Sequence, residues 1–267
     1  MAEVTFDFTG KVVLVTGGGS GIGRQIARDF ARTGAHVVIA GRTTSRLDAL
    51  LAELGGSATA ATVDIGDRTA VRDLIVDIVS RHGRLDTVVS NAAGYIPGDI
   101  TDITPEEWEQ LRRTNVDGFF HLAQATLPEL AKTGGSFVAT SSVSGLRGDW
   151  GSAAYNATKG AVSLFVRALA LDWGARGVRV NAVAPSITNT EPVAGVTGND
   201  ALRRQFEHRV PLGRIAETDD ISPVVLFLAS DAARYVNGVI LPVDGGTSAS
   251  TGQARLVTEG NLLRPRP

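Results

Sequence analysis

The stretch VVLVTGGGSGIG, residues 12–23, indicates how this chain folds. Its apolar, β-branched start is typical of a buried parallel strand over Val12–Val15, and its glycines lead into an expected helix over Gly21–Thr33. Glycine lets the backbone turn sharply and approach a pyrophosphate, and a helix N-terminus presents free N–H groups to an anion. Because a second strand over Val37–Ala40 follows, the order predicts a dinucleotide-binding unit rather than a plain turn.

The spacing of the glycines narrows the kind of nucleotide site. Gly17, Gly21 and Gly23 follow the pattern Gly-x-x-x-Gly-x-Gly, which differs from the Gly-x-Gly-x-x-Gly of many dinucleotide sites. The stretch also lacks the Gly-Lys-Ser/Thr that a P-loop needs. The residues of this turn that we expect to contact the dinucleotide are Gly17, Gly19, Ser20, Gly21, Ile22 and Gly23.

The rest of the chain repeats this alternation of apolar runs and amphipathic stretches. The alternation predicts an α/β fold: a single-domain, doubly wound, seven-stranded parallel sheet with helices on both faces. Thr104 and Glu107 form a capping-box pattern, with Pro105 at the first helical position. Further strands are expected at Ala58–Val63, Leu85–Ser90, Ser136–Thr140, Val178–Val183 and Val239–Val243, and further helices at Thr44–Leu54, Asp67–Arg81, Thr104 to about Leu130, Ala154–Trp173 and Asp219–Ala229.

Two segments interrupt the alternation. Residues 186–213 form a long insertion after the sixth strand, which we interpret as an irregular substrate lid, with a passive surface loop as the alternative. Residues 247–267 are polar and end in Arg-Pro-Arg-Pro, so we expect a disordered C-terminal tail. Residues 1–246 then form the single domain, because no repeat, low-complexity block or linker divides them.

The composition excludes several classes of protein. Apolar residues make up 43% of the 267 residues and charged residues 20%, which fits a globular chain with a substantial core. The formal net charge of −2 gives no basic excess for nucleic acid or an anionic membrane. The absence of cysteine rules out disulfides, thiol catalysis and cysteine metal sites. The four histidines have no metal-ligand spacing, so we expect no metal site.

The N-terminal sequence and the longest apolar runs bear on location. The first residues lack the basic and then apolar pattern of a secretory signal. No apolar run approaches the ~18 residues of a transmembrane helix. We therefore expect a cytoplasmic protein.

The end of the second strand bears on the choice between NAD and NADP. An NAD site usually has Asp or Glu there, about 20 residues after the first glycine. Here Gly41 stands at that position and Arg42 follows it. A carboxylate would repel the 2′-phosphate of NADP, whereas a guanidinium binds it in bidentate fashion, so the sequence favours NADP, with NAD as the alternative. Ser20 stands where a second basic residue would strengthen this prediction.

Tyr155 and Lys159 stand four residues apart at the start of an expected helix, on one face and one turn apart. Tyrosine, with an ordinary pKa near ~10, is a poor base at neutral pH, and a nearby ammonium lowers that pKa. Ser142, at the end of the preceding strand, is suited to hold a substrate oxygen beside the phenol. The chain has only three tyrosines, so chance rarely produces this pair beside a glycine turn.

With these motifs the chain resembles the short-chain dehydrogenase/reductase family over about residues 8–246. The glycine turn matches the family's Thr-Gly-x-x-x-Gly-x-Gly, and residues 91–94 match its Asn-Ala-Gly segment after the fourth strand. Residues 243–246, Val-Asp-Gly-Gly, resemble the usual end of the last strand. One departure is Pro185-Ser186, because the family commonly has Pro-Gly after the sixth strand.

The resemblance implies a Rossmann-like NAD(P)-dependent oxidoreductase that transfers hydride between the nicotinamide and a ketone or secondary alcohol. Tyr155 would protonate the developing alkoxide, Ser142 would donate a hydrogen bond to it, and Lys159 would lower the pKa of Tyr155 and bind the ribose. Asn115 would hold a water that links Lys159 to solvent. The further residues implied to contact the cofactor are Arg42, Asp64, Ile65, Asn91, Ala92, Gly94, Tyr155, Lys159, Pro185, Ser186, Thr188 and Thr190.

Substrate and partners are less determined. Tyr95, Arg147 and Trp150 are candidate substrate-binding residues beside Ser142 and Tyr155, and the aromatic rings suggest an apolar or ring-bearing substrate, with core packing as the alternative. The resemblance also implies a homotetramer or homodimer. Two other functions stay open: an NAD-dependent alcohol dehydrogenase or epimerase of the same family, and a non-catalytic dinucleotide-sensing protein.

Overall fold

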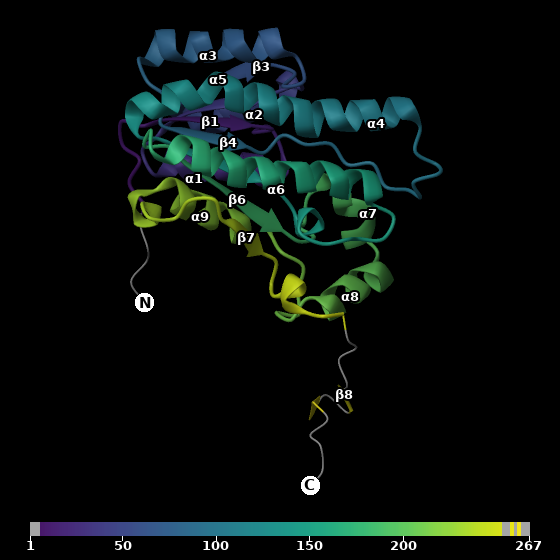
Figure 1. The fold of residues 1–267 in the computed structure, drawn as a ribbon. Coiled ribbons are helices and arrows are strands. Elements are labelled where there is room, and N and C mark those ends of the chain that lie inside the picture. Colours follow the sequence, from purple (N-terminus) through teal and green to yellow (C-terminus); the bar gives the residue numbers. More distant parts are fainter. Residues whose placement is uncertain (1–5, 253–256, 259–260, 263–267) are drawn as a thin grey trace.

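The computed structural model describes residues 6–252, 257–258 and 261–262. Its centre is a sheet of seven parallel strands in the order β3-β2-β1-β4-β5-β6-β7 (Figure 1). This arrangement confirms the doubly wound α/β class. The strands are β1 Val12–Thr16, β2 His36–Gly41, β3 Ala58–Thr62, β4 Thr87–Ser90, β5 Ser136–Thr140, β6 Arg179–Pro185 and β7 Ile240–Val243.

Helices connect these strands and cover both faces of the sheet. Their bounds are α1 Gly21–Arg32, α2 Thr44–Leu54, α3 Arg68–His82, α4 Pro105–Arg112, α5 Gly118–Thr133, α6 Ala153–Gly174, α7 Ala194–Thr197, α8 Asp200–Arg209 and α9 Thr218–Ala229. The helices α3, α5 and α6 pack on one face, and α1, α2 and α9 pack on the other (Figure 1).

Strand β1 shows how one strand serves two cores. Val12 and Leu14 belong to the hydrophobic cluster under α3, α5 and α6, whereas Val13 and Val15 belong to the cluster under α1, α2 and α9. Successive side chains of a strand point to opposite faces, so a strand buried on both sides must be apolar throughout. This geometry is the physical reason for the unbroken apolar run that precedes the glycine turn.

The strand order places the functional site. Strand β1 lies between β2 and β4, so the order of strands reverses there. In open α/β sheets ligands bind outside the carboxyl ends of the strands at such a switch point. The glycine turn after β1 and the segment after β4 therefore meet at one edge of the sheet.

The helix expected from Thr104 to about Leu130 is interrupted. The capping box is confirmed, because the Thr104 hydroxyl accepts from the Glu107 N–H at 3.2 Å and the Glu107 carboxylate accepts from the Thr104 N–H at 2.9 Å. Residues Arg113–Asp117 then form a π-helical turn between α4 and α5. A π turn holds one extra residue per turn and often marks a functional position, and this turn carries Asn115.

The sequence had suggested that the segment 186–213 is irregular, but much of it is helical. It contains a short 3-10 turn, η4 Glu191–Val193, followed by α7 and α8, which lie beyond the tips of β6 and β7 (Figure 1). The Asn199 side chain caps α8 by accepting from the N–H groups of Ala201 and Leu202 at 3.0 and 3.2 Å. Neither α7 nor α8 buries a residue fully, so no apolar stripe signalled them in the sequence.

The predicted C-terminal tail lies largely outside the described residues. Its first part forms a 3-10 turn over Thr247–Ala249, in which the Thr247 hydroxyl donates to the Asp244 carbonyl at 2.7 Å. Farther on, Val257–Thr258 pairs antiparallel with Asn261–Leu262. Within the described ranges, every helix is too short or too polar to span a bilayer.

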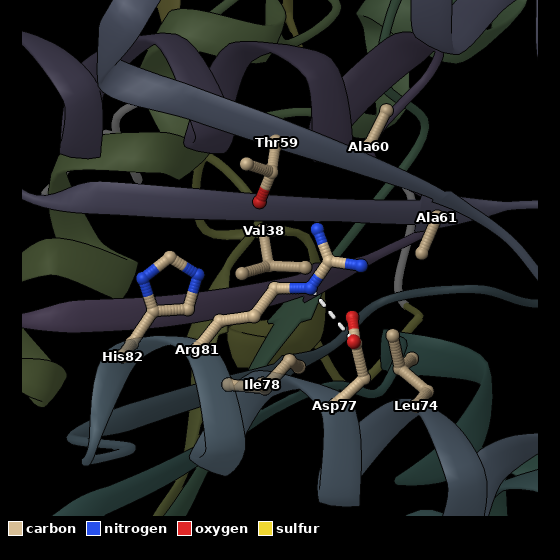
Figure 2. Close-up of a pocket in the computed structure, with 9 residues that line it drawn as sticks. All are labelled: Val38, Thr59, Ala60, Ala61, Leu74, Asp77, Ile78, Arg81 and His82. Atoms are coloured by element: carbon tan, nitrogen blue, oxygen red, sulfur yellow. Dashed lines mark hydrogen bonds and ion pairs between the residues drawn. The ribbon is translucent and has the colours of Figure 1, made fainter.

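A small cavity lies at the β3 edge of the sheet, between β2, β3 and α3 (Figure 2). Its volume is about 60 Å³, which is room for a few water molecules. Arg81 and Asp77 of α3 form an ion pair at its mouth, with Nε to Oδ1 at 2.7 Å. The cavity is too small for a dinucleotide and lies away from the glycine turn.

Beside this cavity the rings of His36 and His82 pack against each other at a tilt of 36°, with their centroids 4.4 Å apart. Burial and the neighbouring His82 lower the pKa of His36 from its ordinary 6.5. Because the unfolded chain then holds this proton to a higher pH than the folded chain, this contribution to stability is present above about pH 6.5 and lost below it.

We expect the urea midpoint of unfolding to fall between pH 7 and pH 5, and His36→Gln to make that fall smaller. The control is His208→Gln, because His208 lies exposed on α8 and contacts neither ring. An equal slope in wild type and His36→Gln would show that this pair does not sense pH.

Candidate active site

The glycine turn is tightly enclosed. Gly17 and Gly21 have φ of +66° and +51°, which favours glycine. A Cβ on Gly17 would lie 2.9 Å from the Ala92 Cα, and a Cβ on Gly19 would lie 3.1 Å from the Arg46 Cβ. Side chains at these positions would therefore press against the loop after β4 and against α2, so the turn keeps its close packing only with glycine.

Thr16 and Asn91 hold this turn against the end of β4. The Thr16 hydroxyl donates to the Val89 carbonyl at 3.2 Å and accepts from the N–H groups of Asn91 and Ala92 at 3.0 and 3.2 Å. The Asn91 amide donates back to the Thr16 carbonyl at 3.1 Å. The rigidity of the turn thus comes from a crosslink between two neighbouring strands.

The start of α1 suits an anionic ligand. Its N-cap residue Ser20 makes no capping hydrogen bond with its side chain, so the first-turn N–H groups keep their capacity to donate. Thr190 approaches the same point from the segment after β6, because a Cβ on Gly21 would meet its Cγ2 at 3.1 Å. The glycine turn and the uncapped start of α1 together fit the pyrophosphate of a dinucleotide.

Arg42, Asp64 and Ile65, which the sequence assigns to the ribose and adenine end of a dinucleotide, follow the ends of β2 and β3. The Arg42 side chain is exposed at the start of α2. Asp64 accepts from the Gly66 N–H at 2.9 Å and forms an ion pair with Arg113 at 3.2 Å. Ile65 is buried in the core, so only its backbone is available to a ligand.

Lys159 is a buried ammonium on α6. It is 4% exposed, and its Nζ donates to the Thr140 carbonyl at 2.7 Å. Burial is the cause that lowers the pKa of Lys159 to about 8. An ammonium in this position keeps further N–H donors for a ligand's hydroxyl groups.

Tyr155 lies one turn before Lys159, and the ammonium is 5.8 Å from the centre of its ring. Burial raises the pKa of Tyr155 to about 12, while a hydrogen bond with Ser142 opposes the increase. The sequence had suggested a pKa lowered by Lys159. In this chain burial is the largest cause and raises the pKa instead, so the phenol holds its proton at neutral pH.

Asn115 joins three elements at the site. Its Oδ1 accepts from the Gly94 N–H at 2.7 Å, and its Nδ2 donates to the Gly94 carbonyl and the Thr158 hydroxyl, both at 3.0 Å. Thr158 in turn donates to the Tyr155 carbonyl at 2.8 Å. The π-helical turn thus ties the loop after β4 to the helix that carries Tyr155.

The expected substrate residues lie in different surroundings. The Tyr95 ring packs edge-on against Tyr155 with centroids 5.0 Å apart, and its hydroxyl lies 3.2 Å from the Ser152 hydroxyl. Trp150 is 89% exposed, which rules out core packing for it. The Arg147 side chain is also exposed, while its backbone N–H donates to the Val143 carbonyl at 3.0 Å and its carbonyl accepts from the Asn156 amide at 3.2 Å.

The segment after β6 is held by a chain of hydroxyl groups. The Ser186 hydroxyl donates to the Asp244 carbonyl at 3.4 Å, the Thr188 hydroxyl donates to the Ser186 carbonyl at 3.0 Å, and Thr190 donates to the Thr188 carbonyl at 3.3 Å. Ser186, which stands beside Pro185 where glycine is usual, thereby attaches this segment to the end of β7.

Sequence reasoning missed three residues of the site. Thr140 supplies the carbonyl that holds Lys159, Thr158 links Asn115 to Tyr155, and Ser152 holds Tyr95. The sequence could have revealed Thr158, because it lies one turn after Tyr155 on the same helix. In residues 6–252 and the short tail ranges, no group of three or more potential ligands could hold a metal ion.

Comparison with known proteins places this arrangement among oxidoreductases. A family model described as Enoyl-(Acyl carrier protein) reductase matches residues 17–248. Meso-2,3-butanediol dehydrogenase of Serratia marcescens is 41% identical over 251 residues, which cover 94% of this chain and 99% of that relative.

Solved structures with nicotinamide cofactors are similar to the whole fold. A gluconate 5-dehydrogenase from Burkholderia cenocepacia J2315, in complex with NADP and tartrate, has a TM-score of 0.87 at 32% identity, covering 92% of this chain and 98% of that chain. The 3-ketoacyl-(acyl-carrier-protein) reductase from Brucella melitensis, complexed with NADH, has a TM-score of 0.86 at 31% identity, covering 91% and 100%. These likenesses support a nicotinamide dinucleotide as the cofactor class.

Proposed function

The chain belongs to the short-chain dehydrogenase/reductase family and is an NAD(P)-dependent oxidoreductase, and from this premise we propose that it interconverts a ketone and a secondary alcohol with NADP(H). One observation carries the proposal: the buried phenol of Tyr155 lies one turn from the buried ammonium of Lys159, which is 5.8 Å from the centre of its ring, and Ser142 acts to lower the phenol's pKa. The glycine turn follows β1 at the same edge of the parallel sheet, and we assign the pyrophosphate of the dinucleotide to it.

Each residue has a defined part in this chemistry. The cofactor, when bound, supplies or accepts the hydride. In the reductive direction Tyr155 gives its proton to the substrate oxygen as negative charge develops there. Ser142 donates a hydrogen bond to the same oxygen. Lys159 donates hydrogen bonds to the cofactor's ribose and, as a cation, favours the phenolate that remains.

Asn115 takes a positioning part. Its two amide N–H groups are committed to Gly94 and Thr158, so it braces the helix that presents Tyr155. We propose that the water relay implied by the family resemblance is held by the backbone of the π-helical turn rather than by this side chain.

The proposal is tested by mixing the enzyme with NADPH or NADH and a panel of ketones, and with NADP+ or NAD+ and the matching alcohols. The panel includes a vicinal diol, because a relative is named for acting on 2,3-butanediol. We expect oxidation of NADPH with at least one ketone. Tight dinucleotide binding without turnover on any member would favour the non-catalytic sensing alternative.

Cofactor preference gives a sharper test. A Cβ on Gly41 would meet only the Leu47 Cδ2 at 3.5 Å, so Gly41→Asp fits without displacing neighbours. Gly41→Asp with Arg42→Ala should exchange the preference from NADPH to NADH, because a carboxylate repels the 2′-phosphate and binds ribose hydroxyls. The measurement is kcat/KM with each cofactor. A wild-type enzyme already faster with NADH would contradict the NADP assignment.

We also propose that α5 and α6 pair with a second copy of the chain. Phe120 of α5 and Leu164 and Leu171 of α6 are 46%, 65% and 84% exposed, and the two leucines are two helical turns apart on one face. Leu164→Glu with Leu171→Glu should give monomers in sedimentation equilibrium where wild type gives dimers or tetramers. A monomeric wild type would contradict this pairing.

The segment with α7 and α8 is proposed to be the substrate lid. Hydrogen bonds attach its start, the root of the lid, to the segment before α9. The Asn189 backbone N–H donates to the Ala216 carbonyl at 2.7 Å, and the Asn189 side-chain amide donates to the Glu217 carboxylate at 3.1 Å. Beyond this root the two helices bury no residue fully, which leaves them loosely attached.

A further inference from the structure

The glycine turn has a basic neighbour that the sequence did not reveal. Ser20 occupies the position where a second cation would support a 2′-phosphate, but Arg46 of α2 lies against the adjacent Gly19, whose Cβ would be 3.1 Å from the Arg46 Cβ. Arg42 precedes the same helix, and the α2 N-cap residue Thr43 makes no capping hydrogen bond with its side chain. Two arginines and an uncapped helix start thus border one side of the turn.

Arg46 is held by a residue from the opposite wall. Its Nη2 lies 2.9 Å from the Oε1 of Glu191, at the start of η4. Glu191 directly follows Thr190, which contacts the other end of the turn at Gly21. The ion pair therefore joins the wall beside Gly19 to the wall beside Gly21.

The exposure of this ion pair makes it exchangeable. The side chains of Arg46 and Glu191 are 47% and 67% exposed, and exposed ion pairs contribute little to stability. A ligand phosphate with roughly −1.5 to −2 charges attracts a guanidinium more strongly than a single carboxylate does. The resting partner of Arg46 is thus one that a phosphate can displace.

We propose that Arg46 is the second cation for the cofactor's 2′-phosphate and that Glu191 is its built-in competitor. This inference rests on the proposed use of NADP(H). The 2′-phosphate takes Arg46 from Glu191, whereas NAD(H) has no group that does so and leaves the ion pair closed. The Arg46–Glu191 ion pair thus helps to set the choice between NADP(H) and NAD(H). Arg46 lies four residues after Arg42.

Two substitutions should act in opposite directions. Arg46→Met keeps the aliphatic stem against Gly19 and removes the charge, so the Kd for NADP+ should rise about 5- to 20-fold while the Kd for NAD+ changes less than about twofold. Glu191→Gln removes the competitor, so the Kd for NADP+ should fall about 2- to 5-fold with NAD+ again unchanged.

The experiment is calorimetric titration of the full chain with NADP+, NAD+, adenosine 2′,5′-bisphosphate and AMP, which needs no turnover. Adenosine 2′,5′-bisphosphate and AMP lack the nicotinamide half of the cofactor, so their affinities report on the adenosine end alone. Arg72→Met is the matched control, because Arg72 is an exposed arginine of α3 paired with Asp73. Thermal melting of each variant checks that it folds.

The outcomes separate this inference from the proposed function. An equal loss of NADP+ and NAD+ binding in Arg46→Met, or weaker NADP+ binding in Glu191→Gln, would overturn the part given to this pair. Tighter binding of NAD+ than of NADP+ by wild type would contradict the cofactor choice alone. A selective effect in Arg42→Met but none in Arg46→Met would restrict phosphate recognition to Arg42.

Discussion

Tyr155→Phe is expected to lower kcat for carbonyl reduction by about 10²–10⁴, the usual loss when a general acid is removed. The substitution deletes one hydroxyl and keeps the ring, so the edge-on contact with Tyr95 at 5.0 Å between centroids is retained. The cofactor Kd should stay near the wild-type value, because the glycine turn is untouched. Steady-state kinetics and a cofactor titration on the same preparation check both statements.

The matched control for this variant is Tyr235→Phe, because Tyr235 is a fully exposed tyrosine. It should change neither kcat nor cofactor affinity. Near wild-type kcat in Tyr155→Phe would remove Tyr155 from the chemistry and transfer the proton donation to another group.

The raised pKa of Tyr155 bears on how the rate in each direction depends on pH. Burial raises the pKa of Tyr155 to about 12, so the phenol is ready to donate a proton but a poor base. The proton donor for reduction should therefore be fully available at neutral pH, and the rate of alcohol oxidation should increase as the pH rises.

Lys159→Met should produce two opposite effects, a large loss of activity and a gain in stability. Activity falls because both the ribose contact and the charge beside Tyr155 are lost. The cofactor Kd should therefore rise and kcat should fall. Burial lowers the pKa of Lys159 to about 8, so the wild-type reductive rate should also fall as the pH rises through about 8. That inflection should disappear in the variant.

The gain in stability follows from the same burial. The pKa of Lys159 drops from its ordinary 10.5 to about 8, which corresponds to an unfavourable free energy on the order of 3 kcal/mol for the charged form. The unfolded chain holds the proton over this window and the folded chain releases it, so the group's contribution to the free energy of unfolding rises from pH 8 to 10.5.

At pH 7 the full cost of burying the ammonium is present. Lys159→Met removes it but leaves the Thr140 carbonyl without its donor, so the free energy of unfolding should rise by about 1–3 kcal/mol. Urea titration measures this change, and Lys132→Met is the control, because Lys132 is an exposed lysine paired with Glu129. A lower free energy of unfolding in Lys159→Met would mean that burial of the ammonium does not destabilise the folded protein.

Local sequence patterns were enough to predict the parallel sheet, because each buried strand needs an unbroken apolar run and each turn needs its own residue chemistry. The run over residues 12–15 and the glycines after it show this most clearly. The capping box at Thr104 and Glu107 was equally readable, since both partners lie within one helical turn. The family resemblance, carried by such short motifs, was confirmed for the same reason.

Helices without an apolar stripe and irregular helical turns escaped this reasoning. The helix α8 is polar and buries no residue fully, so no apolar stripe predicted it. The π-helical turn over Arg113–Asp117 interrupts a pattern that reads as one continuous helix. Its register depends on contacts that Asn115 makes with Gly94 and Thr158, which are far apart in the sequence.

The sequence by itself therefore determined the type of fold, the glycine turn and the identity of the Tyr155–Lys159 pair. Only the tertiary structure decided that Tyr155 has a raised pKa rather than a lowered one, because burial is a property of the packed chain. Likewise only the structure brought Arg46 to Glu191 across 145 residues of sequence. Electrostatic free energies depend on distance and on exclusion of water, and both are set by the folded arrangement, not by spacing along the chain.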